Sequence, residues 1–598
     1  MKPLIDILSD IFSAAFEKAG YAAEYGRCVV SNRPDLCEFQ CNGAMACAKI
    51  YKKAPIAIAN EVVAALPMTD TFKSVEAIAP GFINIIVGEG MLNSYLNEMA
   101  VSDKNGFEPK SVGKTAVIDY GGANVGKPLH VGHLRPAIIG ESVKRLLAFD
   151  GYKTVGDAHL GDWGMPIGLI ITELKKRKPE LVYFDESFDG EYPEENPVTI
   201  SDLEEIYPFA SARSKEDEEY RNEAKQAVVD LQKGRRGYIA LWKKMMDVSK
   251  TDIKRNYDNL NVHFELWNGE SDADALIMPM IEDMKAKGIT RMSEGALVVD
   301  VKEETDNKEM PPCILLKSDG AAIYASTDLA TLVQREQDFK PDKVIYVVDK
   351  RQGLHFEQVF RTSRKAGIVR DETELIFLGN GTMNGKDGKP FKTREGGVMR
   401  LEYLIKEVND KVAEKMADRE LSEEEKADIS RKVGLAALKY GDLSNAATKD
   451  YIFDIDKFTS FEGNTGPYIL YTMVRIKSIF EKYSQATGID ASKIENMVKN
   501  GELRLSCSEG NASEKKLKLQ IAMFSDSMAS ASAEIAPHKV CAYLFELSNL
   551  FNSFYHENKI VSEEDENRRN GFIALIFLTL KLLETGIDLL GIEAPEKM

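Results

Sequence analysis

The stretch "TAVIDYGGANVGKPLHVGHLRPAIIGESVKRLLAF", residues 115–149, decides the fold of this chain. Its first part, TAVIDY (115–120), is a short apolar run typical of a buried strand. Residues 134–149 place apolar side chains at helical spacing, and Gly151 follows as a stop signal. A further strand begins within 153–164. Strand, helix and strand in this order predict a βαβ unit, and hence an α/β fold with a parallel sheet and helices on its faces.

Two of the chain's seven histidines, His130 and His133, stand between that strand and that helix. Ligands of open parallel sheets bind beyond the carboxyl ends of the strands, and a helix N-terminus suits phosphate. Gly132 allows a base or ribose to approach the backbone, and Lys127 adds a positive charge. These residues predict nucleotide phosphate chemistry. Two alternatives stay open at this point: a metal site that needs a third ligand, and a purely structural role for both histidines.

Length and composition limit the class of protein. A chain of 598 residues should hold two to four domains, and 44% hydrophobic with 29% charged residues is typical of a globular protein. Since no apolar run reaches the roughly 18 residues of a membrane span and no signal peptide is recognisable, a cytoplasmic protein without membrane contact is expected. The net charge of −18 argues against indiscriminate binding to nucleic acid but allows a local basic groove.

The cysteines do not indicate a metal site. Four of the seven lie early in the chain, and their spacings contain no C-x-x-C pair. Buried reduced thiols are therefore expected, and no protein-bound structural metal is predicted. The four are Cys28, Cys37, Cys41 and Cys47.

The pattern along the chain predicts three domains. Residues 1–110 form a small α+β domain that includes a strand at 81–87. Residues 111–460 form the parallel-sheet core, with further strands at 342–349 and 374–381 and an acidic, irregular insertion at 184–205. Residues 461–598 form an all-helical domain.

Five segments in order along the chain carry a family resemblance. HVGH (130–133) resembles the HIGH motif of class I aminoacyl-tRNA synthetases, which other nucleotidyltransferases share. The surrounding ANVGKPLHVGHLRPAIIG and the later HLGDWG, GKPFKTREGG, EGNTGPYILYTMVRIKSI and LLGIEAPEKM resemble the arginyl-tRNA synthetase family. The resemblance implies a Rossmann-type catalytic core with a KMSKS-like loop, an N-terminal domain that contacts tRNA, and a C-terminal anticodon-binding domain of the DALR type.

The reaction that the resemblance implies is the ligation of L-arginine to tRNA(Arg). ATP activates the amino acid as arginyl-adenylate with release of pyrophosphate, and transfer to tRNA then releases AMP. Mg²⁺ is expected to accompany ATP. His130 and His133 match the two histidines that hold the phosphates as charge develops, while Gly132 and His355 are expected beside the nucleotide.

The KMSKS-like loop departs from the family pattern. In GKPFKTREGG (388–397), Pro390 and Thr393 stand where the two lysines of the motif would lie. Lys389 and Lys392 remain as candidate catalytic cations. Arginyl enzymes with such a loop often carry a lysine just before HIGH, and Lys127 occupies that place.

Recognition of arginine needs carboxylates, because a guanidinium is planar, always charged and donates in a fork. By the resemblance, Asp328 is the expected bidentate partner, with Tyr324 closing the pocket and Glu270 as a second acid. The α-amino and carboxylate end is expected at Asn124 and Gln352. The full set of candidate arginine-binding residues is Asp119, Asn124, Glu270, Tyr324, Asp328 and Gln352.

The C-terminal helices are expected to read tRNA. Tyr468, Tyr471 and Arg475 fall on one helical face, and aromatic rings beside an arginine suit unpaired bases. We expect one tyrosine to pack in the core and the other to contact RNA. In the N-terminal domain no residue stands out, and its basic side chains are equally compatible with a solvated surface.

Other readings of the same features remain. A different class I synthetase or an HxGH nucleotidyltransferase would share the histidines but not Tyr324 and Asp328. A catalytically altered paralogue that binds tRNA or arginine for regulation would share the fold and the degenerate lysine loop. The family is usually monomeric, so a monomer is expected.

Overall fold

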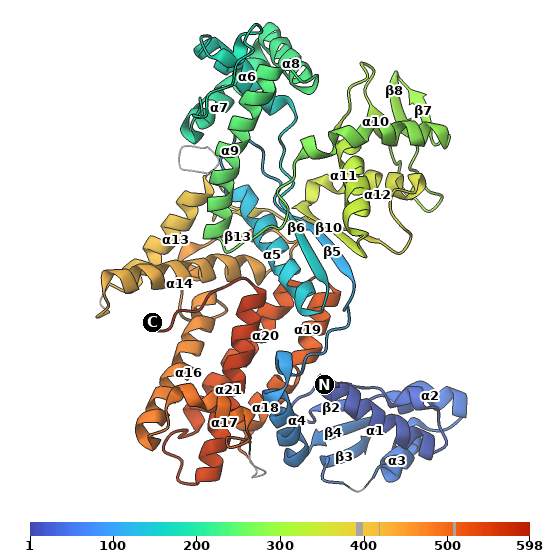
Figure 1. The fold of residues 1–598 in the computed structure, drawn as a ribbon. Coiled ribbons are helices and arrows are strands. Elements are labelled where there is room, and N and C mark those ends of the chain that lie inside the picture. The colour runs from blue at the N-terminus through green and yellow to red at the C-terminus, as the bar shows by residue number, and fades with distance from the viewer. Residues whose placement is uncertain (68, 390, 392–398, 418, 506–509) are drawn as a thin grey trace. The chain divides into compact units, whose positions relative to one another are not determined.

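The computed structural model describes residues 1–67, 69–389, 391, 399–417, 419–505 and 510–598, and its ribbon is drawn in Figure 1. The chain divides into two compact units. One comprises Ser111–Ser460 with Leu589–Glu593, and the other comprises Met1–Lys110, Phe461–Asp588 and Ala594–Met598. The division into three domains stays a prediction.

A four-stranded parallel sheet forms the centre of the first unit, as predicted. Its order is β11-β10-β5-β6, from Glu374–Asn380, Lys343–Asp349, Thr115–Asp119 and Lys153–Asp157. Because β5 lies between β6 and β10, the order of the strands reverses there, and all four strands end at the same edge. Helix α5 (Leu134–Phe149) connects β5 to β6, and α12 (Gly353–Ala366) connects β10 to β11.

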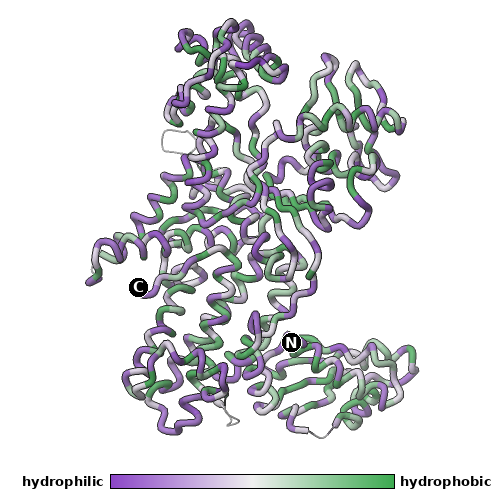
Figure 2. Tube along the Cα trace, in the orientation of Figure 1, coloured by the Kyte–Doolittle hydropathy of each residue, from purple (hydrophilic) through white to green (hydrophobic). Residues whose placement is uncertain are grey.

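Hydropathy along the trace follows this architecture. In Figure 2 the helices alternate purple and green along their length, whereas the strands of the parallel sheet are more uniformly green. One-sided helices that cover a sheet buried on both faces give this pattern. Among the described residues, none of the helices combines the length and apolarity that crossing a bilayer would require.

The predicted insertion is only partly irregular. Residues 185–199 form turns and bends, but helix α7 begins at Ile200 and runs to Glu216. A capping box starts it, since the amide of Asp202 donates to Thr199 Oγ1 (3.2 Å) and the amide of Thr199 donates to Asp202 Oδ2 (2.8 Å). Around α7 lie α6 (Met165–Arg177), α8 (Glu218–Gln232) and α9 (Arg236–Asn259).

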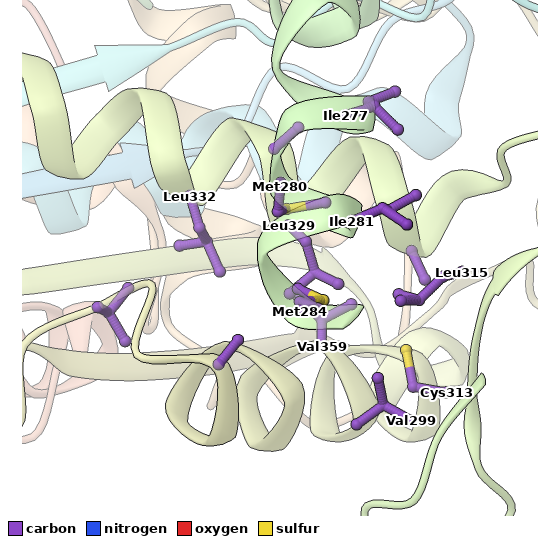
Figure 3. Close-up of a cluster of buried hydrophobic side chains, with 14 of the residues drawn as sticks. Ile277, Met280, Ile281, Met284, Val299, Cys313, Leu315, Leu329, Leu332 and Val359 are labelled. Carbon is purple, nitrogen blue, oxygen red and sulfur yellow. The ribbon is translucent and has the colours of Figure 1, made fainter. Parts of the chain in front are cut away.

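A second core holds three helices against one another. Figure 3 shows one apolar cluster that contains Ile277, Met280, Ile281 and Met284 of α10 (Glu270–Ala286) together with Leu329 and Leu332 of α11 (Tyr324–Phe339). Val359 of α12 joins them. The sheet β7 (Thr290–Ser293), β8 (Ala296–Val299), β9 (Cys313–Leu316) adds Val299, Cys313 and Leu315. This packing fixes the first turns of α10 and α11, which carry three of the predicted arginine-binding residues.

Helices α13 (Leu401–Lys415) and α14 (Glu423–Leu443) complete the first unit, with short β12 (Met383–Asn384), β13 (Tyr451–Ile452) and α15 (Ile455–Phe458). Arg135 of α5 forms a buried ion pair with Asp442 of α14 (2.9 Å) and donates to the carbonyl of Lys449 (2.8 Å). Lys439 Nζ donates to the carbonyls of Leu260 and Gly591, both at 2.8 Å. The bonds of Arg135 tie α14 and the segment after it to α5, and those of Lys439 tie α14 to the segment after α9 and to Gly591.

The second unit joins the two ends of the chain. Its antiparallel sheet β1-β2-β4-β3 comprises Cys28–Val30, Phe39–Cys41, Phe82–Val87 and Phe72–Ile78, so the strand predicted at 81–87 is confirmed. Helices of the early part are α1 (Leu4–Lys18), α2 (Gly43–Tyr51), α3 (Pro55–Ala65) and α4 (Glu89–Val101). The four early cysteines are buried free thiols.

The later part of this unit is helical, as predicted. It contains α16 (Gly466–Thr487), α17 (Ile494–Lys499), α18 (Ala512–Ala522), α19 (Phe524–Ala533), α20 (Pro537–Glu557) and α21 (Glu566–Leu589). Lys515 and Lys518 of α18 form ion pairs with Glu38 (2.8 Å) and Glu89 (3.2 Å) of the early part. Within this unit, therefore, the two ends of the chain pack as one body.

Candidate functional site

The histidine turn lies directly beyond β5. Residues Val131–His133 form a 3₁₀ turn that leads into α5. The amide of Gly132 donates to His130 Nδ1, and the amide of His130 donates to His133 Nδ1, both at 3.0 Å. The two rings lie 4.0 Å apart between centroids. Backbone amides therefore fix both imidazoles at the start of the helix.

These hydrogen bonds define the protonation state of the two rings. Burial and the charge of Lys127 lower the pKa of His130, and burial, His130 and Lys127 together lower the pKa of His133 to about 3. Both rings are therefore neutral near pH 7. Because each Nδ1 accepts a hydrogen bond, each ring carries its proton on Nε2. Both histidines can donate Nε2–H to an anionic oxygen.

A cavity of about 230 Å³ opens beside this turn at the carboxyl edge of the sheet. Gly132 has no room for a larger side chain, since a Cβ there would lie 2.8 Å from His130 Cε1. The cavity combines hydrogen-bond donors with an apolar wall, which suits a nucleotide. It is lined by His130, Val131, Gly132, Arg135, Asp349, Arg351, Asn380, Gly381, Thr382, Met383 and Phe391.

The three candidate lysines have different settings. Lys127 is half-buried and lies 4.2 Å from the ring centroid of Tyr207. Lys389 is exposed, on a turn where its carbonyl accepts from the amide of Gly385 (2.8 Å). Lys392 lies outside the described residues, as does most of the predicted KMSKS-like loop. Of these three lysines, Lys127 is therefore the one for which the structure gives a contact of the ammonium group.

Helices α10 and α11 begin beside one another and gather three of the predicted arginine-binding residues. Asp328 Oδ2 bonds His355 Nε2 of α12 at 2.5 Å. Glu270 is the first residue of α10, and burial together with the nearby charges of Asp162 and Asp328 raises its pKa to about 7. Tyr324, the first residue of α11, is 68% exposed. The starts of the two helices thus bring together two acids, Glu270 and Asp328, and the exposed aromatic ring of Tyr324.

Asp119 is already engaged by the protein. Its Oδ2 accepts from Arg335 Nη2 at 2.6 Å, and the same nitrogen donates to Asp157 Oδ2 at 2.7 Å. All three side chains are buried. Ligand atoms of Asp119, Asp157 and His159 lie within 4.8 Å of one another, which resembles a metal site. A guanidinium on both carboxylates disfavours a cation there, so the group is better understood as an internal ion-pair network.

Arg335 is the residue that sequence reasoning missed. It follows Asp328 by seven positions on α11, which places both on nearly the same helical face. The sequence did contain one signal for it, which is a charged residue on the apolar face of this helix, seven positions after Asp328. Its two partners lie 216 and 178 residues away, so their identity is not visible from local sequence.

Two further predicted arginine-binding residues, Asn124 and Gln352, lie near the carboxyl edge of the sheet. Asn124 forms a backbone bridge with Gly161, where a Cβ would lie 2.4 Å from Asn124 Oδ1. Gln352 is exposed at the start of α12, beyond the end of β10. His355 bonds Asp328 as described, and its place beside adenosine stays a prediction. Within the described chain these residues all lie near the carboxyl edge of the sheet.

The predicted tRNA-reading residues belong to α16, and two of them, Tyr468 and Arg475, bond asparagines of α20. Tyr468 donates to Asn549 Oδ1 (2.8 Å) and accepts from Asn552 Nδ2 (2.9 Å). Arg475 bonds Asn552 and lies 4.8 Å from the ring centroid of Tyr471. The hydroxyl of Tyr468 is thus held by two partners within the helix pair, while Tyr471 is half-buried and stacked by a cation.

Comparisons with known proteins cover the whole chain. Residues 96–455 match the catalytic domain of class I tRNA synthetases (R), residues 469–598 the DALR anticodon binding domain, and residues 6–87 the arginyl tRNA synthetase N terminal domain. The chain is 57% identical to the "Arginine--tRNA ligase" of Agathobacter rectalis and 53% identical to that of Alkaliphilus oremlandii, in each case over 100% of both chains.

Solved structures agree in fold. A crystal structure of arginyl-tRNA synthetase from Plasmodium falciparum is similar with a TM-score of 0.79 at 24% identity, and the Thermus thermophilus enzyme with a TM-score of 0.77 at 22% identity. Each covers 100% of both chains. Two full-length relatives are more than 50% identical to this chain. The histidine turn beyond β5 and the acids of α10 and α11 fit the same family. The chain therefore belongs to the arginyl-tRNA synthetase family of class I aminoacyl-tRNA synthetases.

Proposed function

We propose that this chain ligates L-arginine to tRNA(Arg) with ATP, and that the site described above performs both steps. The observation that carries the proposal is the histidine turn, in which backbone amides fix two neutral imidazoles and His130 lines a cavity at the carboxyl edge of the sheet. The acids of α10 and α11 lie at the same edge. The family to which the chain belongs performs this reaction.

In the first step a carboxylate oxygen of arginine attacks the α-phosphorus of ATP, and the bond to pyrophosphate breaks. His130 and His133 donate to phosphate oxygens as charge develops on them, and Lys127 provides a fixed positive charge. Lys389 and Lys392 of the following loop are proposed to add to this charge. Mg²⁺ enters with ATP as the counter-ion of the phosphates.

In the second step a ribose hydroxyl of the terminal adenosine of tRNA attacks the carbonyl carbon of arginyl-adenylate, and AMP leaves. No new protein nucleophile is needed, because the adenylate is already activated. The task of the site is then to hold the adenylate and the tRNA end together.

Recognition of the guanidinium is proposed for Asp328 and Glu270, with Tyr324 closing over it. Glu270 and Asp328, both half-buried, supply acceptors for a group that has five N–H donors and no acceptor. Asn124 and Gln352 are proposed to hold the α-amino and carboxylate end. Asp119 is proposed as a further arginine-binding residue, and its carboxylate is held by Arg335.

The binding of arginine is expected to weaken as pH falls through 7. Burial raises the pKa of Glu270 to about 7, so its carboxyl is increasingly protonated below that pH, while a guanidinium needs the carboxylate. The KM for arginine should be about tenfold higher at pH 6 than at pH 8. Glu270→Gln should raise the KM and remove its pH dependence.

The matched control for that experiment is Glu282→Gln, an exposed acid on the same helix that forms a surface ion pair with Lys285. It should keep the wild-type KM and pH profile. A Glu270→Gln enzyme that retains the wild-type rise in KM toward pH 6 would assign the titration to another group.

Reading of tRNA is proposed for the face of α16 that carries Tyr471 and Arg475. Replacing Tyr471 by alanine should raise the KM for tRNA(Arg) about tenfold, because one stacked base contributes about 1–3 kcal/mol. Tyr468→Phe is the matched control, since it keeps the ring and loses only internal hydrogen bonds. If the control is impaired and Tyr471→Ala is not, the two tyrosines have the opposite roles.

The experiment that tests the function is ATP–pyrophosphate exchange with arginine, with and without tRNA(Arg), and with lysine as the control. Exchange that requires arginine supports the proposal, and a further requirement for tRNA would couple binding of tRNA to the first step. Absence of exchange from folded protein under both conditions would favour the catalytically altered paralogue that binds tRNA or arginine for regulation.

Two further properties are proposed from the family. The chain is expected to act as a monomer, and it is expected in the cytoplasm, where aminoacyl-tRNA is consumed. Sedimentation of the purified protein at several concentrations, with and without tRNA, measures the first directly.

A further inference from the structure

We propose that Tyr207 of helix α7 is a positioning residue for Lys127 in the activation step. The inference rests on the proposed function, in which the ammonium of Lys127 faces the phosphates of ATP. It assigns a role to helix α7, for which the sequence resemblance gave none.

The contact between the two side chains is direct. Lys127 Nζ lies 4.2 Å from the ring centroid of Tyr207, within the range of a cation–π interaction. Lys127 follows Gly126, whose φ of +78° makes a turn that favours glycine. A lysine on such a turn has a long, flexible stem and would sample many rotamers without a partner. The ring restricts the ammonium to one region beside the histidine turn.

The ring is itself held in place. Tyr207 packs against a buried cluster on α6, α7 and α8 that consists of Leu169, Ala210, Tyr220 and Ala224. The capping box at Thr199 fixes the start of its helix two turns earlier. Packing among α6, α7 and α8 therefore determines the position of the Tyr207 ring.

A second contact joins the same helix to Arg400, the backbone partner of His130. Glu204 precedes Tyr207 by three positions, on the same helical face, and bonds Arg400 Nη2 at 2.7 Å. Arg400 in turn pairs with His130 through a backbone bridge. Helix α7 thus contacts Lys127, which precedes His130 in the chain, through Tyr207, and Arg400, which pairs with His130, through Glu204.

The charge of Lys127 makes its position important. Burial is the main cause that lowers the pKa of both histidines, and the charge of Lys127 adds to it, so the ammonium lies near both rings. Displacement of the ammonium would remove a positive charge from the phosphates and would also weaken this effect on the rings. Tyr207 should therefore influence the rate of activation without touching the substrate.

The test compares Tyr207→Leu, Tyr207→Phe and Lys127→Met with the double variant Lys127→Met/Tyr207→Leu, all in the full chain with tRNA(Arg) present. Tyr207→Leu should lower kcat/KM for ATP in the exchange reaction about fivefold, the effect of a cation–π contact of about 1 kcal/mol. Tyr207→Phe keeps the ring, so its kcat/KM for ATP should equal that of the wild type. In the Lys127→Met background the leucine should have no further effect.

The matched control is Phe209→Leu, which removes an aromatic ring from the same helix at a site 47% exposed, where it lies beside Arg177. It should leave kcat/KM for ATP unchanged, and the KM for arginine should be the same in all Tyr207 variants. Thermal melting of each variant reports whether the helix is intact.

The outcomes separate this inference from the proposed function. If Lys127→Met impairs the exchange reaction and Tyr207→Leu does not, the positioning role of Tyr207 is overturned and the proposed function stands. Normal exchange by Lys127→Met removes the proposed role of Lys127 and the positioning role with it. A loss from Tyr207→Leu that persists in Lys127→Met, or that appears as a raised KM for arginine, means that Tyr207 acts through its neighbour Tyr324 instead.

Discussion

Replacing Asp328 by asparagine is expected to lower kcat/KM for arginine about a thousandfold. The amide keeps the volume of the side chain but turns one acceptor into a donor, which then faces the N–H groups of the guanidinium. Removing one partner of a hydrogen-bonded charge pair costs about 2–5 kcal/mol, and about 4 kcal/mol corresponds to a thousandfold. Arginine-dependent ATP–pyrophosphate exchange at a series of arginine concentrations measures the change.

Two variants control for indirect effects of this substitution. Asp338→Asn changes an exposed acid at the end of the same helix and should behave as wild type. His355→Gln removes the ring that bonds Asp328. If His355→Gln reproduces the full loss, the guanidinium is bound elsewhere and Asp328 serves to hold His355.

Replacing His133 by alanine is expected to lower kcat of the exchange reaction by about 10²–10³-fold. The substitution removes the Nε2–H donor and the acceptor that fixes the amide of His130. Because the pKa of His133 is lowered to about 3, the ring is neutral throughout the working range. The loss should therefore be the same at pH 6.5 and at pH 8.

A comparison with His133→Asn separates the two roles of the ring. Asparagine can replace Nδ1 as an acceptor for the amide of His130 but cannot reach as far as Nε2. Equal losses in both variants would locate the effect in the donor. Full activity of either variant, with binding of tRNA(Arg) unchanged, would contradict the catalytic assignment of His133.

The parts of the fold that the sequence predicted are those with local signals. The strand at Thr115–Asp119 is an uninterrupted apolar run, and α5 has helical spacing followed by a glycine, so both elements were predicted within a residue. The insertion was predicted as irregular because its acidic composition masks the capping box that starts α7 at Thr199. Acidic residues there serve the helix as well as the surface.

The parts of the site that were missed depend on long-range contacts. Lys127 was predicted from its place before the histidines, but its contact with Tyr207 joins residues 80 positions apart and leaves no periodic pattern. The bond between Asp328 and His355 likewise depends on how α11 and α12 pack. Residue type and spacing predict which groups could act, whereas packing decides which of them meet.

Arg335 has a consequence for any redesign of amino-acid specificity. Seven residues of α-helix rise about 10 Å, so Asp328 stands about that height above the point where Arg335 is bound to the ends of β5 and β6. In the proposed arginine site, this ion-pair anchor and the helix between the two positions fix how far Asp328 stands from the sheet. Substitutions of neighbouring side chains would leave that distance unchanged, but an insertion or deletion between positions 328 and 335 would change it and should alter which amino acid the proposed site accepts.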